Sequence, residues 1–249
     1  MLTPIKTDRE LDAMREGGKI LATILDLLIG KAEVGVTPRE LAVIAAAEIK
    51  KHGASAPFLG YHGFPDVICI SVNNQVQHCI PNNRPFQEGD VVNFDFGVTY
   101  KGLITDAGVT IGIGKLSSDD QRLVDGTKAA LDAALGIIKN GVRVGDISNA
   151  IESVLVEQDL GIVRELVGHG VGHDLHEEPD IPNYGWAKTG PILKTGMTIA
   201  VEPITTLGDE DIYIDKDGQS IYTVDGSKSA QFEHTILVLD KGCEILTTL

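Results

Sequence analysis

Apolar residues recur at steps of three and four in four stretches of the chain, a spacing that places them on one face of an α-helix. The first two stretches begin at the capping boxes Thr7–Glu10 and Thr37–Glu40, in which a threonine and a glutamate together cap the start of the helix. The third opens at Ser118–Gln121, and the fourth covers about residues 145–158. The pattern therefore predicts four amphipathic helices.

Runs of apolar residues typical of buried strands follow each pair of predicted helices. They cover residues 67–72 and 91–98 in the first half of the chain, and residues 197–204 and 232–239 in the second half. Both halves show the order of cap, helix, Gly-Val turn and helix, which indicates a duplication with pseudo-two-fold symmetry and a cleft between the halves. Helices kept apart from hairpin-like strands predict an α+β fold in which helices cover a mainly antiparallel sheet.

Composition narrows the class of protein. With 249 residues, 43% of them hydrophobic, the chain can bury a sizeable core, and no linker-like stretch marks a domain boundary. The formal net charge of −15 predicts no binding to nucleic acid or to an anionic membrane. No apolar run approaches the roughly 18 residues that span a bilayer, and the N-terminus lacks the apolar core of a secretory signal. Three cysteines without a Cys-X-X-Cys pair fit a reducing compartment, so we expect a cytoplasmic protein.

Two aspartates stand where a pair of strands would bury them. Asp95 lies inside the apolar run Val91–Val98, and a hairpin centred between Tyr100 and Lys101 would place Asp106 directly opposite. Two like charges that face each other destabilise a strand pair, and a buried carboxylate needs compensation. Each could instead be a single solvent-facing carboxylate on an exposed strand. A bound metal ion would supply the compensation.

Three histidines, His169, His173 and His176, lie within eight residues of one another. A lone histidine is usually a satisfied polar residue, but a cluster favours a functional site. Gly170 and Gly172 between them oppose a helix, so the sequence predicts a glycine-rich loop whose backbone approaches a ligand closely. We assign no role to His173.

Two glutamates extend the set of possible metal ligands. Glu202 ends one apolar run of the second half, and Glu233 opens the other. Each alone is typical of a surface charge at the end of a strand. Together with Asp95, Asp106 and His169 they form an oxygen-rich set with one imidazole, which suits divalent Mn, Fe, Co or Zn. A pair of such ions can activate water and polarise a carbonyl group.

The order of these five residues resembles the ligand signature of the methionine aminopeptidases, which belong to the pita-bread superfamily together with creatinase and the Xaa-Pro peptidases. The matching strings are Gly60–Pro65, Ser71–Asn73, His78–Pro81, Gly89–Asn93, His169–Gly172, His176–Pro179 and Ser229–Thr235. The likeness covers nearly the whole chain and is to the type I enzymes, because no long insertion and no N-terminal zinc-binding or basic extension is present. It implies a pita-bread fold and a single catalytic domain over residues 1–249.

The resemblance also implies roles for the five ligands on two divalent metal ions. Asp95 would hold the first ion, Asp106 and Glu233 would bridge both, and His169 and Glu202 would hold the second. Glu202 would in addition move a proton to the leaving amide nitrogen.

The same resemblance implies a substrate site. His78 and His176 would contact the substrate near the scissile amide, and His176 would stabilise the oxyanion. The wall of a methionine pocket would be formed by Phe58, Tyr61, Phe64 and Cys69. Core packing is an equally good interpretation of Phe58 and Cys69. Cys79 stands where the family usually has glycine, so we expect its side chain to narrow the cleft or to shift the loop of His78.

The implied function is a metal-dependent hydrolase that removes the N-terminal methionine from peptides and nascent proteins, preferring a small second residue. Its partners would be peptide N-termini that start with Met, with the ribosome as a further candidate. Two alternatives stay open. A Xaa-Pro aminopeptidase usually has an extra N-terminal domain, for which 249 residues leave no room. A non-catalytic pita-bread binding module typically loses metal ligands, whereas all five are present here.

Overall fold

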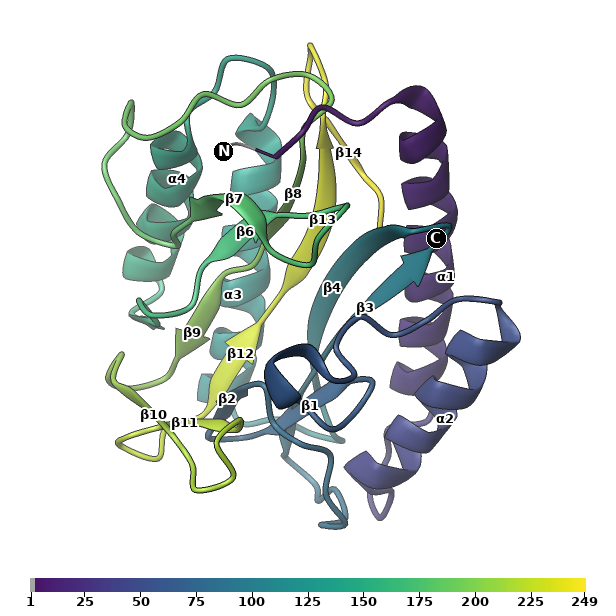
Figure 1. Ribbon diagram of the computed structural model, residues 1–249. Helices are drawn as coiled ribbons and strands as arrows, with labels where there is room; N and C mark the ends of the chain where they lie inside the picture. The colour runs from purple at the N-terminus through teal and green to yellow at the C-terminus, as the bar shows by residue number, and fades with distance from the viewer. Residues whose placement is uncertain (1–2) are drawn as a thin grey trace.

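The helices lie in two pairs, one beside each half of a curved sheet, in the computed structural model, which describes residues 3–249 (Figure 1). The first pair is α1 (Asp8–Ile29) and α2 (Pro38–Lys51), and the second is α3 (Ser118–Ile137) and α4 (Val144–Glu157). All four predicted helices are therefore confirmed. None of the helices within residues 3–249 is long and apolar enough to cross a membrane.

Local side-chain chemistry sets where these helices begin. In α1 the Thr7 hydroxyl accepts from the Glu10 backbone N–H (3.4 Å), and the Glu10 carboxylate accepts from the Thr7 N–H (2.7 Å). The reciprocal pair recurs at the start of α2. Helix α3 begins at Ser118 as predicted, and its N-cap is Ser117, whose hydroxyl accepts from the Asp120 N–H (3.1 Å). The Ser117 hydroxyl also donates to the Asp120 carboxylate, and this bond stabilises Ser117 rather than Ser118 as the N-cap.

The strands form one large sheet and two small ones in the part of the chain that is described, and every pairing between them is antiparallel. The large sheet contains β1 (Cys69–Val72), β3 (Val91–Tyr100), β4 (Leu103–Gly112), β13 (Glu233–Val238), β8 (Thr198–Val201), β6 (Gly168–Gly170) and β7 (Glu177–Ile181) in this order, with β14 (Cys243–Ile245) on β13. The small sheets contain β10 (Ile212–Ile214), β11 (Ile221–Thr223) and β2 (Gln75–Gln77), and β12 (Ser229–Gln231), β9 (Ile204–Thr206) and β5 (Gly161–Ile162). A short 3-10 turn covers Tyr61–Gly63. The predicted α+β class is confirmed.

Two buried cores correspond to the two halves of the chain. One lies between helices α1 and α2 and strands β1 and β3, and the other lies between helices α3 and α4 and strands β8 and β13. Strand β13 joins the halves, because it pairs with β4 on one side and with β8 on the other. The yellow β13 runs through the middle of Figure 1 between the two helix pairs. The predicted duplication is therefore visible in the order and the packing of the elements.

The β3–β4 hairpin differs from its predicted register. Asp95 pairs with Gly108 rather than with Asp106, so the two aspartates are diagonal neighbours on one face. The cause is the tight turn at residues 101–102, where both residues have a positive φ (50° and 82°). This turn geometry is favoured in two-residue hairpins, and it moves the centre of the hairpin by one residue. Because the register then changes by two, both carboxylates still point to the same side of the sheet.

Candidate active site

All five predicted metal ligands line one cavity of about 230 Å³ at the junction of the two halves. Strands β3 and β4 supply Asp95 and Asp106, β6 supplies His169, and β13 supplies Glu233, while Glu202 directly follows β8. Each of the five residues is only 2% to 8% exposed. The sheet therefore brings together side chains that are far apart in the sequence, at a position that is almost completely shielded from solvent.

Three of the five predicted ligands lie close enough together to share a metal ion. One atom each of Asp106, His169 and Glu233 lies within 4.8 Å of the other two. The His169 Nε2 atom lies 3.4 Å from Glu202 Oε1. Burial raises the pKa of Glu233, and the negative charges of Asp106, Glu202 and Asp95 add to this rise, so Asp95 belongs to the same cluster.

The four carboxylates lack the partners that buried charges require. Asp95 Oδ1, Asp106 Oδ1 and Glu233 Oε1 are buried without a hydrogen bond, and among residues 3–249 no lysine or arginine forms an ion pair with the cluster. Burial, and then mutual repulsion, raises the pKa values of Asp95, Glu202 and Glu233 well above their ordinary range. Burial raises the pKa of Asp106 to about 7. Such a set of oxygen donors fits divalent cations, which would supply the missing positive charge.

His169 has the orientation and the protonation state of a metal ligand. Its Nδ1 atom lies 2.9 Å from the Gly170 carbonyl oxygen, to which it donates, so the lone pair of Nε2 points toward Glu202. Burial, followed by the nearby His176, lowers the pKa of His169 to about 3, so the imidazole is neutral. Neutral imidazole is the form that binds metal.

The prediction that His169 lies in a glycine-rich loop is wrong, because Gly168–Gly170 forms strand β6. A Cβ atom at Gly168 would collide with the carbonyl oxygen of Ala200 on β8, and one at Gly170 with that of Glu178 on β7. The glycines therefore allow close approach between strands rather than a loop. The irregular segment begins only at Val171.

Two glutamines support the cluster, and the sequence interpretation missed both. The Gln77 Nε2 atom donates to Asp95 Oδ2 (2.9 Å), and the Gln231 Nε2 atom donates to Glu233 Oε2 (3.1 Å). Gln231 is itself oriented by Asn93, whose Nδ2 donates to Gln231 Oε1 (3.0 Å). Gln231 precedes Glu233 by two residues, so it lies within one of the matching strings and could have been found there. No pattern in the sequence around Gln77 identifies it as a neighbour of the cluster.

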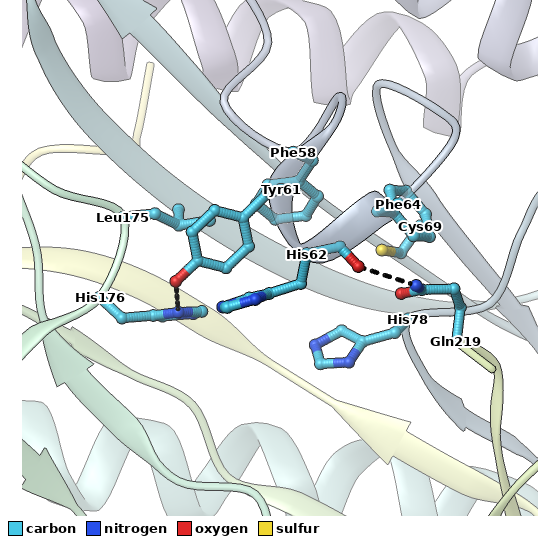
Figure 2. A pocket seen from close by; sticks show the side chains of 9 residues that line it. All are labelled: Phe58, Tyr61, His62, Phe64, Cys69, His78, Leu175, His176 and Gln219. Atoms are coloured by element: carbon cyan, nitrogen blue, oxygen red, sulfur yellow. Dashed lines mark hydrogen bonds between the residues drawn. The ribbon is translucent and has the colours of Figure 1, made fainter.

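A second cavity of about 140 Å³ adjoins the first and is shown in Figure 2. Its lining includes all four residues predicted for the methionine pocket, namely Phe58, Tyr61, Phe64 and Cys69. Phe58, Phe64 and Cys69 also belong to the core of the first half, so Phe58 and Cys69 pack in the core and line this cavity at the same time. The lining residues that the sequence interpretation missed are His62, Leu175 and Gln219.

Phe58, His78 and His176 line both cavities, so the two spaces meet at these side chains. The His176 Nδ1 atom lies 2.7 Å from the Tyr61 hydroxyl, as the dashed line in Figure 2 marks. When Tyr61 donates to Nδ1, Nε2 holds the proton and can donate to a ligand. The His176 ring centre lies 4.3 Å from that of His169, which places this donor beside the carboxylate cluster.

The expectation that Cys79 narrows the cleft is wrong. Its side chain is 0% exposed and lines neither cavity. The Sγ atom donates to the carbonyl oxygens of Gln77 (3.3 Å) and Ile221 (3.6 Å), which lie on β2 and β11. His78 faces the cavities with a positive φ of 54°, whereas the next side chain points into the protein.

Residues 12–240 match the metallopeptidase family M24, and the chain belongs to this family. A relative named methionine aminopeptidase 1, from Bacillus subtilis, is 42% identical over 242 residues, which are 97% of this chain and 98% of that protein. A crystal structure of methionine aminopeptidase from Thermotoga maritima superposes with a TM-score of 0.98 at 39% identity and covers 100% of both chains. Prolidase from Pyrococcus furiosus shares the fold alone, with a TM-score of 0.80 at 23% identity over 98% of this chain and 65% of that one. The predicted pita-bread fold is confirmed.

Proposed function

We propose that this protein is a methionine aminopeptidase, which hydrolyses the first peptide bond of chains that begin with Met and prefers a small second residue. One observation supports this function above all: the cavity with five buried ligand residues opens directly into an apolar pocket. The nearly full-length relatives named methionine aminopeptidase support the same activity.

Membership in family M24 indicates that the enzyme depends on a divalent metal. We propose two ions of the class Co, Mn, Fe or Zn. Asp95 would hold the first, Asp106 and Glu233 would bridge both, and His169 and Glu202 would hold the second. Bound there, the ions would activate water and polarise the scissile carbonyl.

The chain's own residues would orient the substrate and move the protons. Glu202 is a suitable acid and base, because burial raises its pKa, and it would pass a proton to the leaving amide nitrogen. His176 would donate from Nε2 to the carbonyl oxygen as negative charge develops there. His78, at the junction of the two cavities, would contact the peptide on the far side of the scissile bond.

The pocket of Figure 2 would hold the methionine side chain. Phe58, Phe64 and Leu175 make its surface apolar, and a volume of about 140 Å³ suits one unbranched side chain. Methionine is flexible and polarisable enough to fill such a space against aromatic rings.

We further propose that residues 1–249 form a single catalytic domain, although the first two residues lie outside the described part. The sheet that continues through β13 from one half to the other supports this proposal. We also propose that the enzyme acts in the cytoplasm on peptides and on nascent chains, with the ribosome as a candidate partner. Its net charge of −15 argues against binding nucleic acid directly.

Hydrolysis of Met-Ala-Ser and Ala-Pro-Ala by one preparation tests the proposed activity. The protein is stripped with a chelator and reloaded with Co, Mn, Fe or Zn, and bound metal is measured alongside kcat/KM. We expect release of Met from Met-Ala-Ser, none without metal, and slower cleavage of peptides that begin with Leu or Lys. Faster cleavage of Ala-Pro-Ala would identify a Xaa-Pro aminopeptidase, and inactivity on all peptides with metal bound would identify a binding module.

A further inference from the structure

The segment between β6 and β7 ends at His176 and is irregular throughout. We call residues Val171–His176 the His176 loop. At its start, the Ile104 N–H donates to the Gly172 carbonyl oxygen (2.7 Å), which fixes the loop to β4. The His176 side chain at its end is exposed to the cleft. The loop therefore needs support between these two points if His176 is to hold one position.

The Glu177 carboxylate supplies that support. Its Oε1 atom accepts from the backbone N–H groups of His173 (2.6 Å) and Asp174 (3.2 Å), in the middle of the loop. Its Oε2 atom accepts from the Lys6 ammonium (2.7 Å) and from the Thr3 hydroxyl. One carboxylate thus connects the His176 loop to the segment that precedes α1.

The Lys6 side chain is buried by the residues that it contacts. Its side chain is 0% exposed, that of Glu177 is 7% exposed, and Lys6 also donates to the Thr3 hydroxyl (2.7 Å). A Cβ atom at Gly172 would collide with Lys6 Cε, so the lysine stem lies directly against the loop. A second connection joins the His173 ring to Glu10 of α1, with Nε2 and Oε1 2.7 Å apart.

We infer that Lys6 and Glu177 are positioning residues, which hold the His176 loop so that His176 points at the reacting carbonyl. This inference rests on the proposed function. Neither residue lines either cavity, so both act through the loop rather than on the substrate. A buried ion pair with its hydrogen bonds satisfied holds one geometry firmly. Displacement of a reacting group by about 1 Å can reduce a rate by roughly 100-fold.

The double variant Lys6→Met, Glu177→Gln tests the inference. It removes both charges at nearly constant volume, whereas a single substitution would leave one buried charge without its partner. We expect unchanged bound metal, a decrease of about 10- to 100-fold in kcat on Met-Ala-Ser, little change in KM, and faster amide exchange at His173 and Asp174. The matched control is Lys101→Met, Glu16→Gln, which removes an exposed pair of similar length (2.8 Å) and should change none of these, because within residues 3–249 neither side chain hydrogen-bonds to the loop.

Combination with His176→Ala separates a positioning role from a merely structural one. If Lys6 and Glu177 act through His176, the double substitution lowers kcat by less than about twofold once the imidazole is gone. An equal loss of kcat with and without His176 would overturn the inference. If the double variant does not fold, Thr3→Val, which removes one donor to Glu177, replaces it in the same cycle.

Failure of the proposed function would look different. Wild-type protein would then leave Met-Ala-Ser uncleaved, while the amide exchange of the His176 loop and the NMR signals of the His176 ring could still be compared between variants. Unchanged exchange and unchanged ring signals in the double variant would overturn the positioning role by themselves.

Discussion

The protein buries carboxylates in two regions and compensates their charge differently. Glu177 has a lysine partner at 2.7 Å, and the bonds from Lys6 and Thr3 outweigh burial, so its pKa is lowered. The cluster of Asp95, Asp106, Glu202 and Glu233 has no lysine or arginine partner within residues 3–249, and the pKa of each member is raised.

This contrast shows how a ligand site can be recognised in the absence of the ligand. A buried charge that the chain neutralises with its own residues serves the structure, as the Lys6–Glu177 pair does. A buried negative charge that has no positive partner in the chain destabilises the protein until a cation binds. Such a charge therefore indicates a cation-binding site. Substitutions in the compensated and the uncompensated region should therefore have different consequences.

Removal of a bridging carboxylate should have the largest effect. Glu233→Gln or Asp106→Asn should abolish aminopeptidase activity and lose at least one bound metal ion, because a neutral amide replaces an anionic ligand. In the presence of a chelator, Glu233→Gln should raise the free energy of unfolding at pH 7, because burial and the neighbouring acids disfavour the charged carboxylate of Glu233. Peptide assays, metal analysis and urea titrations measure the three quantities.

Glu177→Gln is the matched variant for the compensated region. It should lower the free energy of unfolding by roughly 3–5 kcal/mol, because it leaves the buried Lys6 without an anion. The same substitution, Glu to Gln, should therefore raise the free energy of unfolding at Glu233 and lower it at Glu177. Wild-type activity with full metal content in Glu233→Gln, or equal destabilisation by the two substitutions, would contradict the comparison.

His176→Ala should have the next largest effect. Loss of one preorganised donor lowers kcat by roughly 10²–10³-fold, about 2.7–4 kcal/mol. Bound metal and the melting temperature should stay unchanged, because His176 is exposed and is not among the five ligands. Metal content, melting temperature and kcat are measured on the same preparation. A large drop in melting temperature with kcat nearly intact would show that His176 only packs against its neighbours.

The pH dependence of stability should separate the two regions further. Burial raises the pKa of Asp106 from 3.8 to about 7, so in this interval the folded state holds a proton that the unfolded state releases. Wild-type stability is therefore lost relative to Asp106→Asn as pH rises from about 4 to about 7, by at most about 1.4 kcal/mol per pH unit. The buried histidines titrate in both proteins and cancel in the difference.

Urea titrations of both proteins in chelator at each pH measure this difference. Saturating metal should remove it from the wild type. In the compensated region, stability should depend on pH with the opposite sign. Because the pKa of Glu177 is lowered, the stability that Glu177 contributes is lost as pH falls below the ordinary range of a glutamate. A difference between Asp106→Asn and wild type that stays constant from pH 4 to pH 7 would show that Asp106 is not shifted.

Gln231→Met should give the smallest effect. It preserves volume but removes the donor to Glu233 Oε2, and outer partners of this kind contribute about 10- to 100-fold to metal affinity. Metal titration measures the change. The control is Gln121→Met, because Gln121 lies exposed on α3. Within residues 3–249 its side chain forms one hydrogen bond, to Asp125 (2.9 Å). Equal metal affinity for both variants would show that Gln231 does not support the cluster.

Sequence reasoning succeeded where a few neighbouring residues decide the structure. The caps of α1 and α2 depend on side chains three residues apart, and both were predicted. The five ligands were predicted because an ordered set of strings resembles a family, not because their spacing alone requires a site. The structure places all five in one cavity, while their roles on the metals stay predictions.

One error was local, because the β3–β4 register depends on the backbone of the turn at residues 101–102, which residue types alone do not specify. The other errors arose where distant parts of the chain decide the structure. Gly170 was assigned to a loop, since the strand that crowds it comes from elsewhere in the chain. Gln77 and Lys6 acquire their partners only after folding, so no local pattern identifies them.

The pairing of β13 with β4 has a consequence for how the protein folds. It connects residues that are far apart in sequence: the Asp106 N–H donates to the Thr235 hydroxyl, 129 positions away. Closing so long a loop is entropically expensive and slow. The acidic residues of the two halves repel one another only after this closure, so each half can collapse around its own core beforehand without that repulsion. Divalent cations should therefore slow unfolding far more than they accelerate folding, because the site exists only once the halves have joined.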